Sequence, residues 1–186
     1  WGRAAVAADV ARAAREHPQA RAVLVTQNET STGVLNPIEE IAREVRAERP
    51  DVLLLVDGVS GVAAAPLMTD AWDLDVVVTG SQKAWMAPPG LAMLSVSERA
   101  WQAHRSARLP RFYWDFAAAR RAIDLGQVPY TPAVGLFYAL QAALCMMRAE
   151  GREAIWARHA ALAERVRAGV RQLGLELFAD PAHYSP

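Results

Sequence analysis

The residues best able to do chemistry follow three apolar segments of the 186-residue chain. Lys83 is the only lysine, and it follows "DVVVTG" together with Ser81 and Gln82. Asp57 follows "DVLLLV", and Thr30 lies in "TQNETSTG" after "AVLV". In open α/β sheets, ligands bind outside the carboxyl ends of the strands. We therefore expect an amine, a carboxylate and several hydroxyl or amide groups to meet in one crevice.

This combination of side chains suits pyridoxal 5′-phosphate. That cofactor needs a lysine for its covalent attachment, a carboxylate that keeps its ring nitrogen protonated, and hydrogen-bond donors for its phosphate and ring hydroxyl. Each residue also has a plainer interpretation. Asp57 could be a turn residue before Gly58, Lys83 a surface lysine, and "NETSTG" a polar loop. Their coincidence at three strand ends favours the cofactor site.

The pattern of apolar residues predicts the elements that would position this site. We expect helices over "RAAVAADVARAAREH" and "NPIEEIAREVRAE", the second with Asn36 as N-cap and Pro37 at its first position, and a helical piece around "APLMTDAW". The strands expected are "RAVLVTQ", "DVLLLVDGV", "DVVVTGS" and "LAMLSVS". Continuous apolar strands separated by helices predict an α/β fold with a mainly parallel sheet.

The last third of the chain has a different character. Two long helices are predicted, "PAVGLFYALQAALCMMRAEG" and "REAIWARHAALAERVRAGVRQLG", joined at Gly151 and ending at Gly174. "LELFA" is predicted to be a strand, and the segment Leu109 to Pro129 to be irregular. We expect residues 1–130 to be part of a large domain, 131–174 to be interdomain helices, and 175–186 to begin a small, truncated C-terminal domain.

Composition limits the partners and the compartment. The net charge is zero and the pI is about 7.1, so nothing favours nucleic acid or an anionic membrane as a partner. The single cysteine, Cys145, lies in a helical apolar stripe, where we expect a buried, inert thiol and a cytoplasmic protein. The four histidines have no metal-like spacing, so no metal site is expected.

The blocks "NETSTGVLNPIEEIA", "LLLVDGVSGVAAAPLMTDAWDLDVVVTGSQKAWMAPPG" and "PYTPAVGLFYAL" occur together and in order. With them the chain resembles the class V pyridoxal-phosphate aminotransferases, nearest the alanine–glyoxylate and serine–glyoxylate branch. The resemblance implies the type I fold of pyridoxal-phosphate enzymes and a homodimer with shared active sites. It also implies amino transfer between a small amino acid and glyoxylate or another 2-oxo acid.

The resemblance also implies a role for individual residues. Lys83 would form the Schiff base and, as a free amine, move a proton between the substrate α-carbon and the cofactor. Asp57 would pair with the ring nitrogen, and Val59 would pack on the ring. Thr30 would hydrogen-bond the ring oxygen and Gln82 the phosphate. Thr131 would reach the phosphate of the neighbouring subunit with Tyr130 close by. Independently of the resemblance, we expect Trp85 and Met86 to pack beneath the site and not to touch the substrate.

The chain departs from the family pattern in two ways. Gln27 stands where the family often has a histidine, and the sequence assigns it no role. The family's phosphate loop, ring-stacking aromatic residue and substrate-binding arginine would lie outside these residues. Alternatives are a class V lyase or desulfurase, or a catalytically incomplete module. The glutamine beside Lys83 and the helical position of Cys145 argue against a desulfurase.

Overall fold

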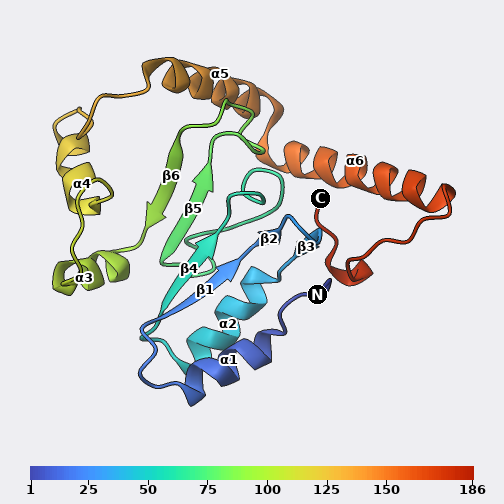
Figure 1. Ribbon diagram of the computed structural model, residues 1–186, viewed down its shortest axis with the longest axis horizontal. Helices are drawn as coiled ribbons and strands as arrows, with labels where there is room; N and C mark the ends of the chain where they lie inside the picture. Colours follow the sequence, from blue (N-terminus) through green and yellow to red (C-terminus); the bar gives the residue numbers. More distant parts are fainter.

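A computed structural model describes all residues, 1–186, and contains two sheets with helices around them. The larger sheet has four strands in the order β1-β4-β5-β6 (Figure 1). The first three run parallel, and β6 pairs antiparallel with β5. The strands are β1 Ala22–Thr26, β2 Asn28–Glu29, β3 Val34–Leu35, β4 Leu53–Asp57, β5 Val76–Gly80 and β6 Ala92–Val96. The mainly parallel α/β sheet predicted from the sequence is confirmed.

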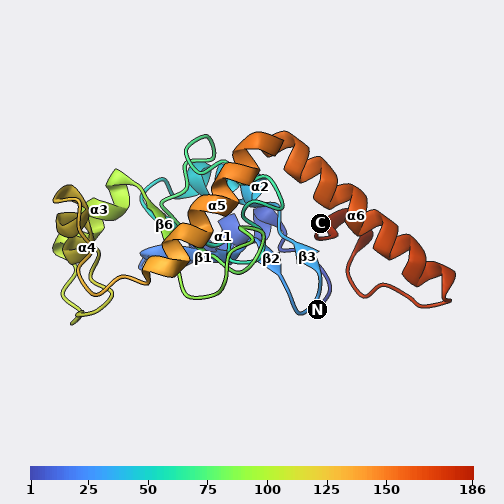
Figure 2. The same ribbon diagram turned by 90° about the horizontal axis from the view of Figure 1, so that it is seen from above.

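The helices frame this sheet without covering it evenly. They are α1 Ala7–Glu16, α2 Ile38–Glu48, α3 Glu98–Ser106, α4 Phe116–Asp124, α5 Val134–Glu150 and α6 Arg152–Gln172, and a short 3₁₀ helix spans Pro181–His183. Seen from above, α5 crosses the molecule and α6 continues outward from it as an arm (Figure 2). None of the helices is long and apolar enough to cross a membrane.

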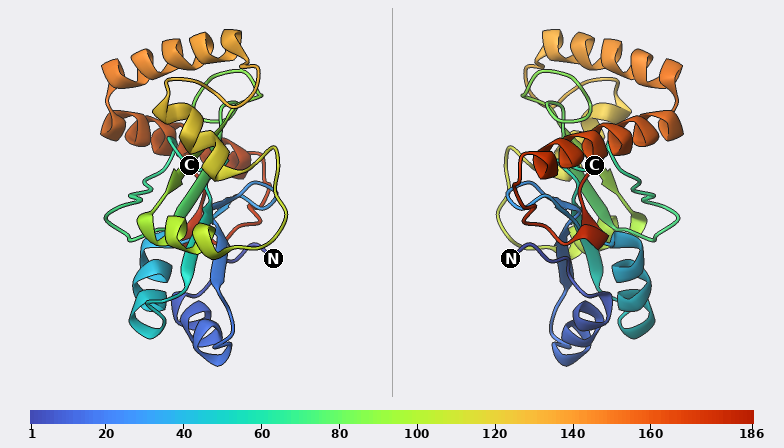
Figure 3. Two further views of the ribbon diagram at one scale, coloured as in Figure 1. Left: turned by 90° about the vertical axis from the view of Figure 1, so that its left-hand side faces the viewer. Right: turned by 90° about the vertical axis from the view of Figure 1, so that its right-hand side faces the viewer.

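The core lies between α1, α2 and one face of the sheet. Ile41 and Val45 of α2 pack with Leu54 and Val56 of β4, all almost fully buried. The other face is open: Leu24 of β1 is 74% exposed. It borders a hollow of about 480 Å³ over β1, β4 and β5. Figure 3 shows α1 and α2 at one end of the strands and the α5–α6 arm at the other.

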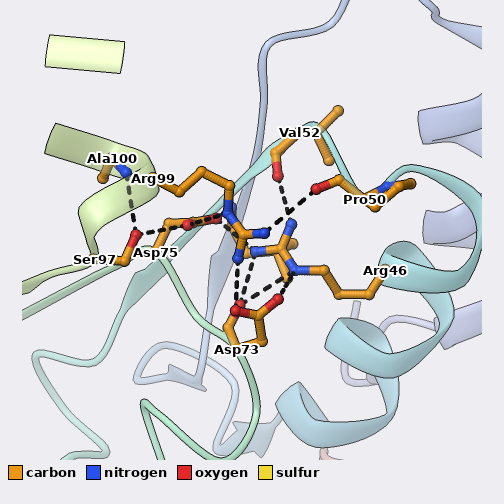
Figure 4. Close-up of polar contacts among 9 residues, drawn as sticks. Arg46, Pro50, Val52, Asp73, Asp75, Ser97, Arg99 and Ala100 are labelled. Atoms are coloured by element: carbon orange, nitrogen blue, oxygen red, sulfur yellow. Dashed lines mark hydrogen bonds and ion pairs between the residues drawn. The ribbon is translucent and has the colours of Figure 1, made fainter. Parts of the chain in front are cut away.

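A charged cluster joins elements at the amino end of β5 (Figure 4). The Asp75 carboxylate is fully buried and accepts hydrogen bonds from Arg46 Nη2 at 2.6 Å and Arg99 Nε at 2.7 Å. The Leu54 N–H and the Ser97 hydroxyl each donate to it at 2.7 Å. Burial by itself raises the pKa of Asp75, but the bonds from Arg99, Leu54, Ser97 and Arg46 together hold it below its usual value.

Several local predictions are wrong. Asn36 does not cap α2; its amide donates to the Thr26 carbonyl at 2.8 Å and accepts the Ala5 N–H at 2.8 Å, which ties two segments together. The stretch from Ala65 to Trp72 forms turns instead of a helix. Cys145 is exposed on α5, so its thiol is not buried.

The C-terminal predictions have a mixed outcome. Both long helices are present and meet at Gly151, and Gly174 follows the end of α6 with a φ of +75°. The expected strand over residues 175–179 is absent. The segment expected to be irregular contains α4, whose N-cap is Asp115; its carboxylate accepts the Ala117 N–H at 3.0 Å.

Candidate active site

Three loops leave the same edge of the larger sheet and carry most of the predicted site residues. The register pairs Thr26 of β1 with Asp57 of β4, and Asp57 with Val78 of β5. Because these strands are parallel, the loops 27–33, 57–66 and 81–91 all begin at their carboxyl ends. This is the edge at which open α/β sheets bind ligands. The backbone therefore brings the Thr30, Asp57 and Lys83 segments together as predicted.

Asp57 ends β4 with its side chain exposed. Its Oδ1 accepts the N–H of Val59 at 2.9 Å, and its Oδ2 has no partner within the chain. Gly58 donates its N–H to the Val78 carbonyl at 2.8 Å, and a Cβ there would overlap the Val62 side chain. The turn interpretation and the site interpretation of Asp57 are thus compatible, because one oxygen makes the turn and the other remains free to bind a ligand.

Lys83 projects from a closed loop that Ser81 holds at its base. Ser81 is fully buried; its hydroxyl donates to the Pro88 carbonyl at 2.7 Å and accepts the Leu91 N–H at 3.2 Å. Its backbone N–H and carbonyl pair with Leu91 and Ala87. The expectation that Ser81 is a donor for a ligand is therefore wrong, since its proton is used inside the loop. Lys83 itself is exposed, and its ammonium has no hydrogen bond or ion pair in the chain.

The two aromatic and apolar residues after Lys83 differ in position. Trp85 is half-buried and donates from Nε1 to the Thr79 hydroxyl at 3.0 Å, so it packs beneath the loop as expected. Met86 is 48% exposed and has a φ of +59°, an uncommon conformation for a residue other than glycine. The expectation that Met86 packs beneath the site is wrong. Its backbone instead closes the turn that presents Lys83, because its N–H donates to the Lys83 carbonyl at 2.9 Å.

Thr30 connects the first loop to the second. Its hydroxyl lies 2.7 Å from that of Ser60, which follows the Asp57 turn. Glu29 is occupied locally: the Ser31 hydroxyl and N–H both donate to it, and these bonds lower the pKa of Glu29. Val59, between Asp57 and Ser60 in the sequence, is half-buried. The Thr30–Ser60 pair thus fixes the loops beside the carboxylate.

Gln82, Tyr130 and Thr131 have looser connections to this edge. The Gln82 side chain is exposed and folds along the backbone of Gly80, where a Cβ would lie 2.9 Å from Gln82 Oε1. Tyr130 stacks on Tyr113 with ring centroids 4.5 Å apart and donates its hydroxyl to the Phe112 carbonyl at 3.3 Å.

Thr131 is exposed and lies before α5. It does not cap that helix, whose N-cap is Ala133. Its hydroxyl has no hydrogen-bond partner within the chain. Neither residue has a hydrogen bond to the three loops, although Leu136 of α5 packs against Gly90 of the third loop.

The residues at this edge fit pyridoxal phosphate by type and by what they leave unpaired. The only amine side chain and one carboxylate oxygen are both free, and hydroxyl and amide groups lie on the adjoining loops. Sequence reasoning missed Gln27 and Ser60. Ser60 could have been found because it follows the same strand end as Asp57, but no sequence signal reveals that Gln27 is buried.

Comparison of the sequence with known proteins shows the family of this chain. A family model described as aminotransferase class V matches residues 7–185. The chain belongs to this family. It is 47% identical over 92% of its length to the small subunit of a soluble hydrogenase from Synechococcus sp. (strain PCC 6716), of which it covers 44%. It is also 43% identical over 89% of its length to L-aspartate–glyoxylate aminotransferase from Paracoccus denitrificans, of which it covers 42%.

A solved structure agrees with this assignment. The whole chain superposes on 48% of pyridoxamine–pyruvate aminotransferase from Mesorhizobium loti, with a TM-score of 0.91 and 35% identity. The chain therefore has the type I fold of pyridoxal-phosphate-dependent aminotransferases. It spans about half the length of the relatives it matches. The relatives are named for different activities, so the reaction proposed for this chain has to be chosen from the residues at its site.

Proposed function

We propose that this protein belongs to an aminotransferase that uses pyridoxal 5′-phosphate. It would exchange an amino group between a small amino acid, such as alanine or serine, and glyoxylate or another 2-oxo acid. The observation that carries the proposal is the unpaired Lys83, the only lysine, on the loop beside the strand that ends in Asp57. The names of relatives that act on glyoxylate and pyruvate support this substrate class.

Each residue at the sheet edge has a defined task in this reaction. The cofactor, when bound, supplies a ring that withdraws electrons from the substrate α-carbon. Lys83 would hold the cofactor through Nζ, and its free amine would move the proton at the substrate α-carbon. Asp57 would hold a proton on the ring nitrogen through its free Oδ2. Thr30, Val59 and Gln82 would orient the cofactor through its ring oxygen, its ring face and its phosphate.

We further propose a cytoplasmic homodimer in which Tyr130 and Thr131 serve the partner's site. Exposed aromatic side chains between α3 and α4 and on α5 support this, since nothing covers them in the single chain. Phe112 is 79% and Trp114 85% exposed, and Tyr138 of α5 is exposed as well. The proposed division of the chain remains 1–130, 131–174 and 175–186, with α5 and α6 between the large domain and the start of a smaller one.

Covalent labelling of Lys83 tests the proposed function. The full-length protein with added cofactor should show a visible absorbance band, and borohydride reduction should leave a pyridoxyl group on the peptide that contains Lys83. Lys83→Ala and Lys83→Arg should both lack the band and the label. The arginine variant is the matched control, since it keeps the positive charge and cannot form the link. A label that persists in either variant, or its absence from the wild type, contradicts the proposal.

A further inference from the structure

Gln27 is a buried amide directly behind the Asp57 loop. It follows β1 and is only 2% exposed. Its backbone N–H donates to the Asp57 carbonyl at 2.8 Å, and its side-chain Nε2 donates to the Pro66 carbonyl at 2.9 Å. One residue therefore holds both ends of the segment 57–66.

The middle of that segment also rests on Gln27. A Cβ at Gly61 would overlap Oε1 of Gln27 and lie 2.7 Å from its Cδ. The backbone of Gly61 thus packs directly on the amide, at a distance that only glycine permits. The Asp57 loop is held at its start, its middle and its end by the same side chain and its backbone.

The side-chain oxygen of Gln27, Oε1, lowers the stability of the folded protein. Oε1 is buried and has no hydrogen-bond partner, and an unpaired buried acceptor opposes folding. An apolar side chain of similar length, such as methionine, would fill this space without that cost. Stability alone therefore gives little reason for a glutamine here, whereas the bond from Nε2 to Pro66 fixes a loop that carries a site residue.

We propose that Gln27 is a positioning residue that sets the placement of the Asp57 carboxylate against the cofactor ring. The inference rests on the proposed function, in which Asp57 pairs with the ring nitrogen. Gln27 acts through the loop 57–66 and, at its far side, through the Thr30–Ser60 pair. It touches no reacting atom, so its effect must be visible in cofactor binding and in the electronic state of the cofactor.

Gln27→Met separates positioning from stability. We expect the cofactor dissociation constant, measured by absorbance titration with pyridoxal phosphate, to rise about tenfold. The pH at which the visible band changes should move upward, because a less firmly held ring proton withdraws less electron density from the Lys83–cofactor link. The unfolding temperature of the cofactor-free protein should change by about 2 °C or less, since the lost bond is offset by removal of the unpaired Oε1.

The matched control is Gln19→Met, an exposed glutamine between α1 and β1 at the opposite edge of the sheet. It should leave all three measurements unchanged. An unchanged dissociation constant and an unchanged pH midpoint in Gln27→Met overturn the inference. The inference is also overturned if Gln27→Met weakens cofactor binding and at the same time greatly lowers the unfolding temperature of the cofactor-free protein. That result would identify Gln27 as a purely structural residue.

A double-mutant cycle tests the route through Gly61. Gly61→Ala should weaken cofactor binding in the wild type, because the new Cβ pushes the Gln27 amide away. In the Gln27→Ala background the same change should have little further effect, since the space is then free. Additive effects overturn the proposed route. A wild type without a visible band contradicts the proposed function itself. A wild type that shows the band but binds the cofactor no more tightly than Gln27→Met contradicts only the role of Gln27.

Discussion

Asp57 combines two tasks in one side chain. One carboxylate oxygen closes the turn at the end of β4 by accepting the Val59 N–H, and the other is free at the edge of the sheet. Asp57 can therefore act both as the turn residue and as a ligand-binding residue. This division between two oxygens allows a substitution that keeps the turn and removes only the charge.

We expect Asp57→Asn to fold normally and to lose most of its activity. The asparagine oxygen can still accept the Val59 N–H, so the urea midpoint should stay near that of the wild type. A neutral side chain no longer holds the ring proton, so kcat with alanine and glyoxylate should fall about 100-fold or more. An unchanged kcat would assign Asp57 to turn geometry alone.

Sequence patterns predicted which residues come to the sheet edge, but not how each side chain is used. Lys83, Asp57 and Thr30 could be found because strand ends are visible as the ends of apolar runs. The positions of hydroxyls and amides are set by tertiary contacts. Ser81 has the right type for a ligand donor, yet its proton goes to Pro88, and Gln27 looks ordinary until its burial is known.

At the scale of elements, β5 connects a charged cluster to the site. Asp75 lies just before the amino end of β5, and Lys83 follows its carboxyl end. The four donors to Asp75 come from α2, β4, the residue before α3 and α3 itself. Because the strand between them is short and hydrogen-bonded on both sides, anchoring one end fixes the direction from which the Lys83 loop leaves.

We expect Asp75→Asn to destabilise the protein by roughly 3 kcal/mol at pH 7, because it removes the buried one of the two carboxylates that Arg46 and Arg99 share and leaves only the exposed Asp73. Urea unfolding of both proteins measures this difference. Since the folded pKa of Asp75 is lowered, its charge contributes fully above the usual value of 3.8, and the contribution is lost as the pH falls through the folded pKa. The difference in unfolding free energy between wild type and variant should therefore shrink as the pH falls below about 3.8. A difference that is constant down to about pH 2 contradicts this origin.

The parallel strands and the long helices were predictable because their apolar periodicity extends over many residues. Shorter elements were not. Residues 65–72 have a helical composition, but they connect β4 to β5 as turns, and residues 175–179 have a strand-like composition without a partner strand. A strand needs a neighbour to satisfy its backbone, and such a neighbour cannot be read from five residues.

At the scale of the whole molecule, we propose that two copies of the chain complete each site together. Lys83 and Asp57 share the sheet edge, whereas Thr131 lies before α5 with a hydroxyl that has no partner. The exposed Phe112 and Trp114 lie on the surface that we propose a second copy covers. A second copy of the chain would both cover this surface and bring Thr131 to a site.

Mixing two inactive variants tests this arrangement. Lys83→Ala and Thr131→Ala subunits, co-expressed in equal amounts, should recover about one quarter of wild-type activity, because half of random dimers are heterodimers with one intact site of two. The control is Lys83→Ala mixed with Asp57→Asn.

In a heterodimer of Lys83→Ala with Asp57→Asn, each site carries one lesion, because both residues belong to the same subunit's site, so no activity should return. With Lys83→Ala and Thr131→Ala, a Thr131 that acts across the interface places both lesions in one site and leaves the other intact. If Thr131 serves its own subunit, both sites are damaged, and no recovery refutes the shared-site arrangement.

The exposed loop that presents Lys83 has a practical consequence for proteolysis. A protease that cleaves only after lysine can cut this chain once, between residues 83 and 84, and the cut separates β5 from β6. A covalently occupied Lys83 is no longer a substrate for such an enzyme. The ratio of cut to uncut chain on a denaturing gel, after borohydride reduction, therefore counts the fraction of molecules whose lysine is occupied, without any need for a coloured product.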